Sequence, residues 1–179
     1  YLYMLEHRRI VLTGSPSSGK TSLLNHIEHP SIHCFEEVSR QIISKAQAKG
    51  VTQPFLDNPL GFSETLFEHR LRDYFECKKN KIHVYDRGIH DVVAYLHAIG
   101  DDAPCSMLDD CNKYSYDKVF MFPPWQAIFT QDAERIEIFE EAVNFHKVLV
   151  ETYTHFGMQC IEVPKLSIEE RLHFITDYI

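Results

Sequence analysis

Residues 14–21 read Gly14-Ser15-Pro16-Ser17-Ser18-Gly19-Lys20-Thr21, which is the G-x-x-x-x-G-K-T pattern of a phosphate-binding loop. An apolar run, Ile10-Val11-Leu12, precedes it, and a run typical of a helix, residues 22–28, follows it. The two glycines let the backbone take positive φ values, so that successive N–H groups and the helix start converge on a triphosphate. The pattern predicts binding of ATP or GTP. The alternative is a Gly/Ser-rich turn that matches by chance.

Three side chains of this loop have individual roles in the prediction. Lys20 is expected to contact the β- and γ-phosphates, and the Thr21 hydroxyl is expected to ligate Mg²⁺. Pro16 lacks an N–H, so it is expected to point away from the phosphates.

Length and composition fit an ordinary globular domain. The chain has 179 residues, of which 44% are hydrophobic and 25% charged. No stretch approaches the roughly 18 uninterrupted apolar residues of a membrane span, and the start lacks the features of a signal peptide. We therefore expect one domain over residues 1–179, located in the cytoplasm and without a membrane partner.

The charge balance bears on the partners. The formal charge is −8, from 26 acidic and 18 basic residues, and no basic stripe occurs. Binding to a nucleic-acid backbone requires such stripes, so no nucleic-acid partner is expected. A small-molecule ligand is expected instead. The five cysteines are scattered without a Cys-x-x-Cys pair, which predicts reduced thiols.

Short β-rich runs alternate with longer helical ones, the pattern of a parallel sheet covered by helices on both faces. Strands are predicted over residues 9–13, 32–35, 82–85, 118–122 and 160–163. Residues 51–61 contain two prolines and no periodicity, which predicts a loop. Helices are predicted over residues 38–48, 62–79, 133–156 and 167–178, the last with Ser167 as its cap and Glu170 in the capping-box position.

Charged residues follow two of the predicted strands: Glu36 and Glu37 after the second, Asp86 and Arg87 after the third. Since ligands bind beyond the carboxyl ends of the strands in open parallel sheets, these side chains should share an edge with the phosphate loop. Phosphoryl transfer needs carboxylates near the Mg²⁺ and near the attacking hydroxyl, and cations that neutralise the transferred group. The alternative is structural: Asp86 caps the next helix, and Arg87 pairs with it on the surface.

Pro123-Pro124-Trp125 ends the fourth strand and begins a short excursion, residues 123–135, with the position and length of a lid. Arg135, at the base of the next helix, is expected to approach the phosphates when the lid closes. Closure would exclude water and favour transfer over hydrolysis. Alternatively, Arg135 is a surface residue paired with Glu134 or Glu137.

Together these motifs resemble a family of small single-domain proteins named as AAA-type ATPases, which are similar to thymidylate kinase and to the nicotinamide riboside kinase domain. The resemblance implies a P-loop three-layer α/β sandwich. With the right-handed crossover rule, it predicts a five-stranded parallel sheet in the order 2-3-1-4-5. It rests on the phosphate loop, on Tyr85-Asp86-Arg87-Gly88 with Asp91 and Ala94-Tyr95-Leu96, on the motifs between Pro123 and Glu140, and on the Glu-Val-Pro that ends at Pro164.

The resemblance also implies roles for residues at matching positions. A Mg²⁺ site is implied at Thr21 and Asp86, a substrate-side carboxylate at Glu37, and cations at Arg87 and Arg135. Candidates for the substrate pocket are Arg40, Arg70, Arg87 and also Phe62, although general burial statistics favour Phe62 as a core residue. The catalytic set is Lys20, Glu37, Asp86, Arg87 and Arg135, and nucleotide contacts are implied at Gly14, Ser15, Pro16, Ser17, Ser18, Gly19, Lys20, Thr21 and Ser22.

These residues predict a P-loop phosphotransferase, a kinase that transfers the γ-phosphoryl group of Mg·ATP to a nucleoside- or nucleotide-like small molecule. Many nucleotide kinases have several arginines in the lid, but residues 123–135 contain one, which favours a nucleoside-like or other hydroxyl acceptor. The alternatives are an ATPase that acts as a partner-coupled switch and a nucleotide-binding protein without catalysis. A homodimer is left open.

Overall fold

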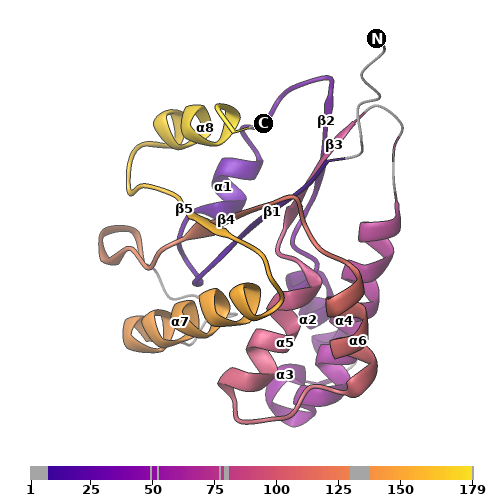
Figure 1. Ribbon diagram of the computed structural model, residues 1–179. Helices are drawn as coiled ribbons and strands as arrows, with labels where there is room; N and C mark the ends of the chain where they lie inside the picture. The colour runs from indigo at the N-terminus through magenta and orange to yellow at the C-terminus, as the bar shows by residue number, and fades with distance from the viewer. Residues whose placement is uncertain are drawn as a thin grey trace.

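The computed structural model describes residues 8–178 except residues 49, 52, 77, 79, 80 and 130–137. Its centre is a sheet of five parallel strands in the order β2-β3-β1-β4-β5 (Figure 1). The predicted strands and their predicted order are both confirmed. The strands are β1 (Arg9–Gly14), β2 (Ile32–Phe35), β3 (Ile82–Asp86), β4 (Lys118–Phe122) and β5 (Cys160–Glu162).

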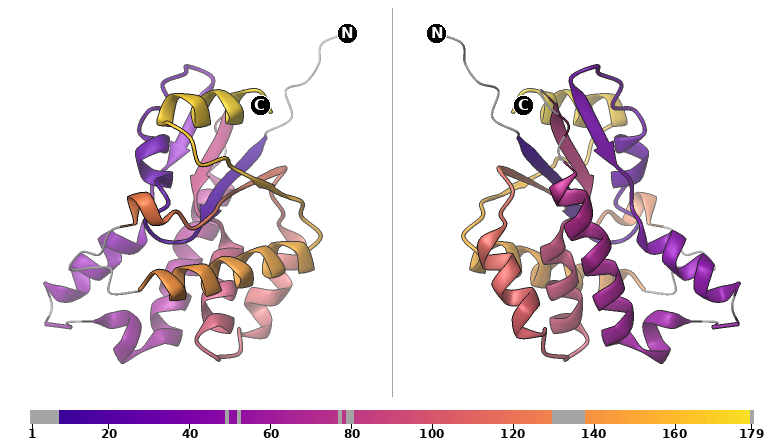
Figure 2. Two further views of the ribbon diagram at one scale, coloured as in Figure 1. Left: turned by 90° about the vertical axis from the view of Figure 1, so that its left-hand side faces the viewer. Right: turned by 90° about the vertical axis from the view of Figure 1, so that its right-hand side faces the viewer.

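Helices cover both faces of the sheet and make the expected three-layer sandwich (Figures 1 and 2). One face carries α1 (Lys20–Leu24) and α8 (Ile168–Thr176). The other face carries α4 (Pro59–Phe75), α5 (Ile89–Ala98), α6 (Cys105–Lys113) and α7 (Phe139–His155). The remaining described elements are α2 (Ser39–Gln47), α3 (Pro54–Asp57) and the 3₁₀ turn η1 (Gln126–Ile128).

Strand β1 lies in the middle of the sheet and is buried on both faces. Ile10 and Leu12 pack on the side of α1 and α8, whereas Val11 packs on the side of α4 to α7. This alternation follows from the pleat of a strand, in which successive side chains point to opposite faces. A strand buried on both faces has an uninterrupted apolar sequence, as this one does. The phosphate loop therefore starts from a rigid support.

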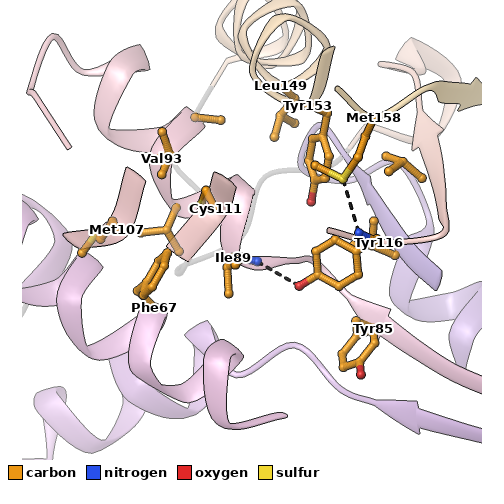
Figure 3. Close-up of a cluster of buried hydrophobic side chains, with 14 of the residues drawn as sticks. Phe67, Tyr85, Ile89, Val93, Met107, Cys111, Tyr116, Leu149, Tyr153 and Met158 are labelled. Carbon is orange, nitrogen blue, oxygen red and sulfur yellow. Dashed lines mark hydrogen bonds between the residues drawn. The ribbon is translucent and has the colours of Figure 1, made fainter. Parts of the chain in front are cut away.

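A cluster of buried side chains holds the start of α5 (Figure 3). The Tyr116 hydroxyl accepts a hydrogen bond from the backbone N–H of Ile89 at 3.1 Å, and the N–H of Tyr116 donates to the Met158 sulfur at 3.4 Å. Gly88 precedes α5, and a Cβ added there would lie 2.6 Å from the Tyr116 ring. Buried contacts thus fix the first turn of α5, which carries part of the candidate site.

The segment between α2 and β3 differs from its prediction. Residues 51–61 are not all loop, because α3 begins at Pro54 and α4 begins at Pro59. Proline is favoured in the first turn of a helix, where the N–H that it lacks has no helical partner. Asn58 caps α4 by accepting a hydrogen bond from the N–H of Gly61 at 3.0 Å. The helix predicted over residues 62–79 therefore starts earlier, and it ends at Phe75.

The other predicted helices agree more closely. Helix α2 lies within residues 38–48. Helix α7 ends one residue before the predicted end at residue 156, but it begins only at Phe139, after the extended backbone of Ile138. The part of this prediction over residues 133–137 lies outside the described residues. In α8 the Ser167 hydroxyl accepts from the N–H of Glu170 at 3.2 Å, which confirms the capping box.

Within the described ranges, no helix has the length and apolar character that crossing a membrane requires. Four described cysteines are free thiols, namely Cys34, Cys105, Cys111 and Cys160.

Gly14 ends β1 at φ 138°, and a Cβ at this position would lie 2.2 Å from the carbonyl oxygen of Phe122 on β4. We expect Gly14→Ala to lower the free energy of unfolding by more than about 2 kcal/mol, because the backbone would be strained and the two strands would have to separate. Urea denaturation measures this loss. The matched control is Gly100→Ala, where φ is 83° but a Cβ would meet no atom within 4 Å. Equal losses in both variants would exclude the contact with Phe122 as the cause.

Candidate active site

The phosphate loop wraps around the side chain of Lys20. The ammonium donates hydrogen bonds to the carbonyl oxygens of Gly14 at 3.2 Å and Ser15 at 2.8 Å, and to the Ser18 hydroxyl at 3.1 Å. Gly19 has φ 84° directly before α1, so the loop turns sharply into the helix. The loop is curled, as its glycines predict, and the lysine is buried inside it.

Burial lowers the pKa of Lys20 to about 7, and the nearby cation of Arg87 acts in the same direction. The carboxylates of Asp86, Glu37 and Asp91 oppose this effect. Such a lysine is partly neutral at neutral pH, and an anion beside it would restore the full charge. The groups of a bound triphosphate are anions of this kind.

Asp86 ends β3 beside the start of α1. Its Oδ2 accepts a hydrogen bond from the Thr21 hydroxyl at 2.8 Å, and its buried Oδ1 has no hydrogen-bond partner among the described residues. Burial, and next the charge of Glu37, raise the pKa of Asp86. Both the free carboxylate oxygen and the adjacent hydroxyl fit Mg²⁺, which prefers oxygen ligands. In the described part of the chain no cluster of three metal-binding side chains occurs, so an ion here would also rely on phosphate oxygens.

Arg87 connects the phosphate loop with two carboxylates. Its Nη1 donates to the carbonyl oxygen of Gly14 and to Asp91 Oδ1, both at 3.1 Å, and its Nε lies 2.7 Å from Glu37 Oε2. Arg87 has φ 73°, a left-handed conformation that is uncommon and costly for a residue with a large side chain. Such strain persists only where the surroundings enforce it, and these three contacts do so.

Glu37 binds two arginines. Arg70 Nη2 lies 2.9 Å from Oε1, Arg87 Nε lies 2.7 Å from Oε2, and the N–H of Ser39 donates to Oε1 at 3.2 Å. Burial by itself would raise the pKa of Glu37, but Arg70 and then Arg87 outweigh it and lower the pKa to about 2. The carboxylate is therefore ionised throughout the physiological pH range.

Asp91 positions Arg87, a role that the sequence analysis does not assign. Its Oδ2 accepts from the Tyr153 hydroxyl at 2.6 Å and from the N–H of Gly88 at 2.9 Å, while Oδ1 binds Arg87 and the Thr13 hydroxyl. Gly88 is the N-cap of α5, and the Asp91 carboxylate, at the N3 position, accepts from its N–H, whereas the Asp86 carboxylate accepts from Thr21. The alternative in which Asp86 caps this helix is therefore wrong.

A cavity of about 650 Å³ opens beside this network. Its walls include the four residues expected in the substrate pocket, namely Arg40, Phe62, Arg70 and Arg87, together with Glu37 and Asp91. Pro16 also lines the cavity, whereas Lys20, Thr21 and Asp86 are not among its described lining residues. The predicted residues thus form two adjoining groups, one at the phosphate loop and one at the cavity, and Arg87 contacts both.

Arg171 of α8 contacts the phosphate loop from outside and is missing from the sequence-based set. Its Nη1 donates to the carbonyl oxygen of Ser18 at 3.2 Å, and its guanidinium lies 5.5 Å from the centre of the Trp125 ring. A Cβ at Gly19 would lie 2.9 Å from the same nitrogen. Nothing in the sequence of residues 167–178 distinguishes this buried arginine from the exposed charges around it.

The expected lid cation, Arg135, lies outside the described residues, so the lid over residues 123–135 stays a prediction.

The sequence matches a family described as AAA domain over residues 9–171. The chain belongs to this family. A comparison with curated proteins gives no match for this chain.

Solved structures show the fold to which this AAA domain is similar. Deoxyadenosine kinase from M. mycoides, with the products dCMP and dCDP bound, has 12% identity and a TM-score of 0.68, over 95% of this chain and 97% of that one. The same enzyme with dATP has 14% identity and a TM-score of 0.64, over 96% and 98%. Thymidylate kinase from Ehrlichia chaffeensis has 17% identity and a TM-score of 0.55, over 96% and 97%. The AAA domain therefore has the P-loop kinase fold, as the sequence resemblance implies.

Proposed function

We propose that the protein is a kinase that transfers the γ-phosphoryl group of Mg·ATP to a hydroxyl of a small molecule bound in the cavity. The observation that carries the proposal is the double contact of Arg87, which binds Gly14 of the phosphate loop and Glu37 of the cavity wall. One side chain thus joins the place expected for a triphosphate to the place available for an acceptor. The folds of deoxyadenosine kinase and thymidylate kinase support the same reaction class.

The residues at the phosphate loop and those at the cavity have different roles in the proposed reaction. Lys20 neutralises the β- and γ-phosphates. Thr21 and Asp86 would hold Mg²⁺, which would supply further positive charge for phosphoryl transfer. Glu37 orients the acceptor hydroxyl and takes up its proton, and Arg87 neutralises charge on the group in transfer. A pKa of about 2 makes Glu37 a weak base. This suffices because the transition state of phosphoryl transfer is loose, so that positioning matters more than base strength.

The charges around the cavity favour an acceptor without a phosphate group. Its described lining contains three arginines and three carboxylates, which balance. Arg70 and Arg87 already bind Glu37, so a phosphate on the acceptor would have to displace a buried carboxylate. A nucleoside-like or other neutral hydroxyl compound meets no such competition. The alternative, an ATPase coupled to a protein partner, is not favoured by the comparisons and makes no use of the cavity.

The proposal is tested by incubating Mg·ATP with a panel of acceptors, detecting products by mass spectrometry and measuring ADP in parallel. We expect ADP formation to depend on the acceptor and to fall in Glu37→Gln, whereas the exposed control Glu68→Gln behaves as the unaltered protein. The kinase proposal must be dropped if no acceptor yields a product, ATP is nevertheless hydrolysed, and Asp86→Asn leaves that hydrolysis unchanged.

The lowered pKa of Lys20 predicts that ATP binding takes up protons. In the free protein this lysine is largely neutral above pH 7, and the bound triphosphate favours its protonated form. ATP affinity should therefore fall as the pH rises from 7 to 9. Calorimetry at pH 8 in two buffers of different ionisation enthalpy measures the protons taken up, and the absence of uptake would contradict the role of Lys20.

Arg171 is expected to act on nucleotide affinity through the loop. Arg171→Leu should weaken binding of Mg·ATP about tenfold, because the Ser18 carbonyl loses a charge-assisted hydrogen bond. Arg171→Lys should restore part of the affinity, since lysine keeps the charge and a donor. Calorimetry measures both variants, with the exposed Arg72→Leu on α4 as the control. Unchanged affinity in Arg171→Leu would show that the contact does not position the loop.

A further inference from the structure

The lining of the cavity changes from charged to apolar along α5. Asp91, Tyr95 and Ile99 follow one another at intervals of four residues and all line the cavity, so they lie on one face of the helix. At 1.5 Å per residue, the eight steps from the first to the last span about 12 Å. Asp91, at the near end, belongs to the network of Arg87 and Glu37, whereas Ile99 lies just beyond the far end of the helix.

The cavity-lining residues of α4 also change from charged to apolar, but in the opposite direction along the chain. Arg70, Leu66 and Phe62 line the cavity at intervals of four residues, and Arg70 binds the carbonyl oxygen of Gly88 at the start of α5. The two helices are therefore antiparallel along the cavity, and each is charged at the sheet end and apolar at the other end. Figure 1 shows α3 beside the ends of α4 and α5 that lie away from the sheet.

The far end of the cavity is apolar. Phe55 and Leu56 of α3 line it, and the ring of Phe55 lies 6.3 Å from the ring of Phe62. The Tyr95 hydroxyl, a polar group in this region, donates to the carbonyl oxygen of Phe55 at 3.2 Å. Leu56 and Ile99 are 55% and 44% exposed, so apolar surface faces solvent at this end of the cavity.

The remaining polar lining residues come from other elements. Ser39 and Arg40 start α2 two residues after Glu37, at the charged end. Glu141 and Asn144 belong to the first turns of α7, and the Glu141 carboxylate already accepts the N–H of Ile138 at 2.9 Å. A polar heterocycle at the far end would leave several of its donors and acceptors without partners, which weakens its binding. An apolar group placed there would instead cover exposed apolar surface.

We infer that the phosphoryl acceptor is an amphipathic alcohol, with its hydroxyl at Glu37 and Arg87 and an apolar body that extends along α5 to Phe55, Leu56 and Ile99. This inference rests on the proposed kinase function and specifies its substrate class. The acceptor oxygen bonds to the γ-phosphorus of ATP while the bond from that phosphorus to the β–γ bridging oxygen breaks. ADP leaves, the hydroxyl proton passes to Glu37 and then to solvent, and the product is a phosphate monoester.

The first test compares acceptors. Linear primary alcohols of increasing length, alcohols with an aromatic body, and the nucleosides adenosine, deoxyadenosine and thymidine are each incubated with Mg·ATP. We expect kcat/KM to rise about fourfold for each added methylene until the cavity is filled, since burying a methylene contributes about 0.8 kcal/mol. Nucleosides should be poorer acceptors than alcohols of similar size.

The second test removes the apolar end. The double variant Leu56→Ser with Ile99→Ser should abolish the gain per methylene, whereas the control Val51→Ser, which alters an exposed apolar residue outside the described lining, should retain it. Nucleosides preferred over alcohols, or a kcat/KM independent of chain length, would overturn the inference and leave the kinase proposal standing. If no compound of either class is phosphorylated while ATP is hydrolysed, the kinase proposal fails and the inference fails with it.

Discussion

Replacement of Lys20 by alanine is expected to abolish measurable binding of Mg·ATP. The ammonium is the buried cation at the centre of the phosphate loop, and without it the β- and γ-phosphates would enter the loop with their charge unmatched. The loop also loses the hydrogen bonds to Gly14, Ser15 and Ser18. Because these bonds are confined to the loop, the variant should still fold, but its phosphate loop should be more mobile.

Calorimetry with Mg·ATP measures the loss, and circular dichroism confirms the fold. The control is Lys45→Ala, an exposed lysine in the last turn of α2. ATP affinity that stays within about threefold of the unaltered protein would refute the assignment of the loop, because a lost contact to a charged group costs more than that.

Replacement of Asp86 by asparagine is expected to lower turnover by at least ~100-fold, because it removes the negative charge beside the expected Mg²⁺ site. The amide has nearly the same shape as the carboxylate and can still accept the hydrogen bond from Thr21. ATP should therefore still bind through the loop, so that kcat changes far more than the dissociation constant of ATP.

Steady-state kinetics at several Mg²⁺ concentrations tests this prediction. The exposed Asp101→Asn serves as the control. If Asp86 holds the metal, the variant should also need a higher Mg²⁺ concentration for half-maximal rate. Turnover within about twofold of the unaltered protein would exclude Asp86 as a metal ligand, since removal of such a ligand has a larger effect.

The sheet could be predicted from the sequence because each strand is marked by local features. The strands are short apolar runs, and the resemblance supplied their order. Helix α3 is not predictable in the same way, because two prolines without periodicity indicate a loop, whereas Pro54 and Pro59 both stand at helix starts. A proline marks a boundary, and the sequence alone does not say whether a helix begins or is absent there.

The site was predictable where strand ends supply its residues. Glu37, Asp86 and Arg87 follow β2 and β3, and topology alone brings them to one edge of the sheet. The pairing of Glu37 with Arg70 depends on the packing of α4, which is set by tertiary contacts. The contact of Arg171 with Ser18 is still harder to predict, since 153 residues separate the two in the sequence and no local pattern marks Arg171.

The central position of β1 has a consequence for the order in which the chain folds. Among the five strands of this sheet, β1 is synthesised before the others, yet its two neighbours are β3, which ends at Asp86, and β4, which ends at Phe122. Both pairings are long-range, and such parallel contacts form slowly. Until β4 has emerged from the ribosome, Gly14 lacks the strand against which it packs, and the phosphate loop lacks its support. Binding of a fluorescent ATP analogue to nascent chains arrested at increasing lengths should therefore begin only after Phe122 is free to pair, so the phosphate loop matures long after it has been synthesised.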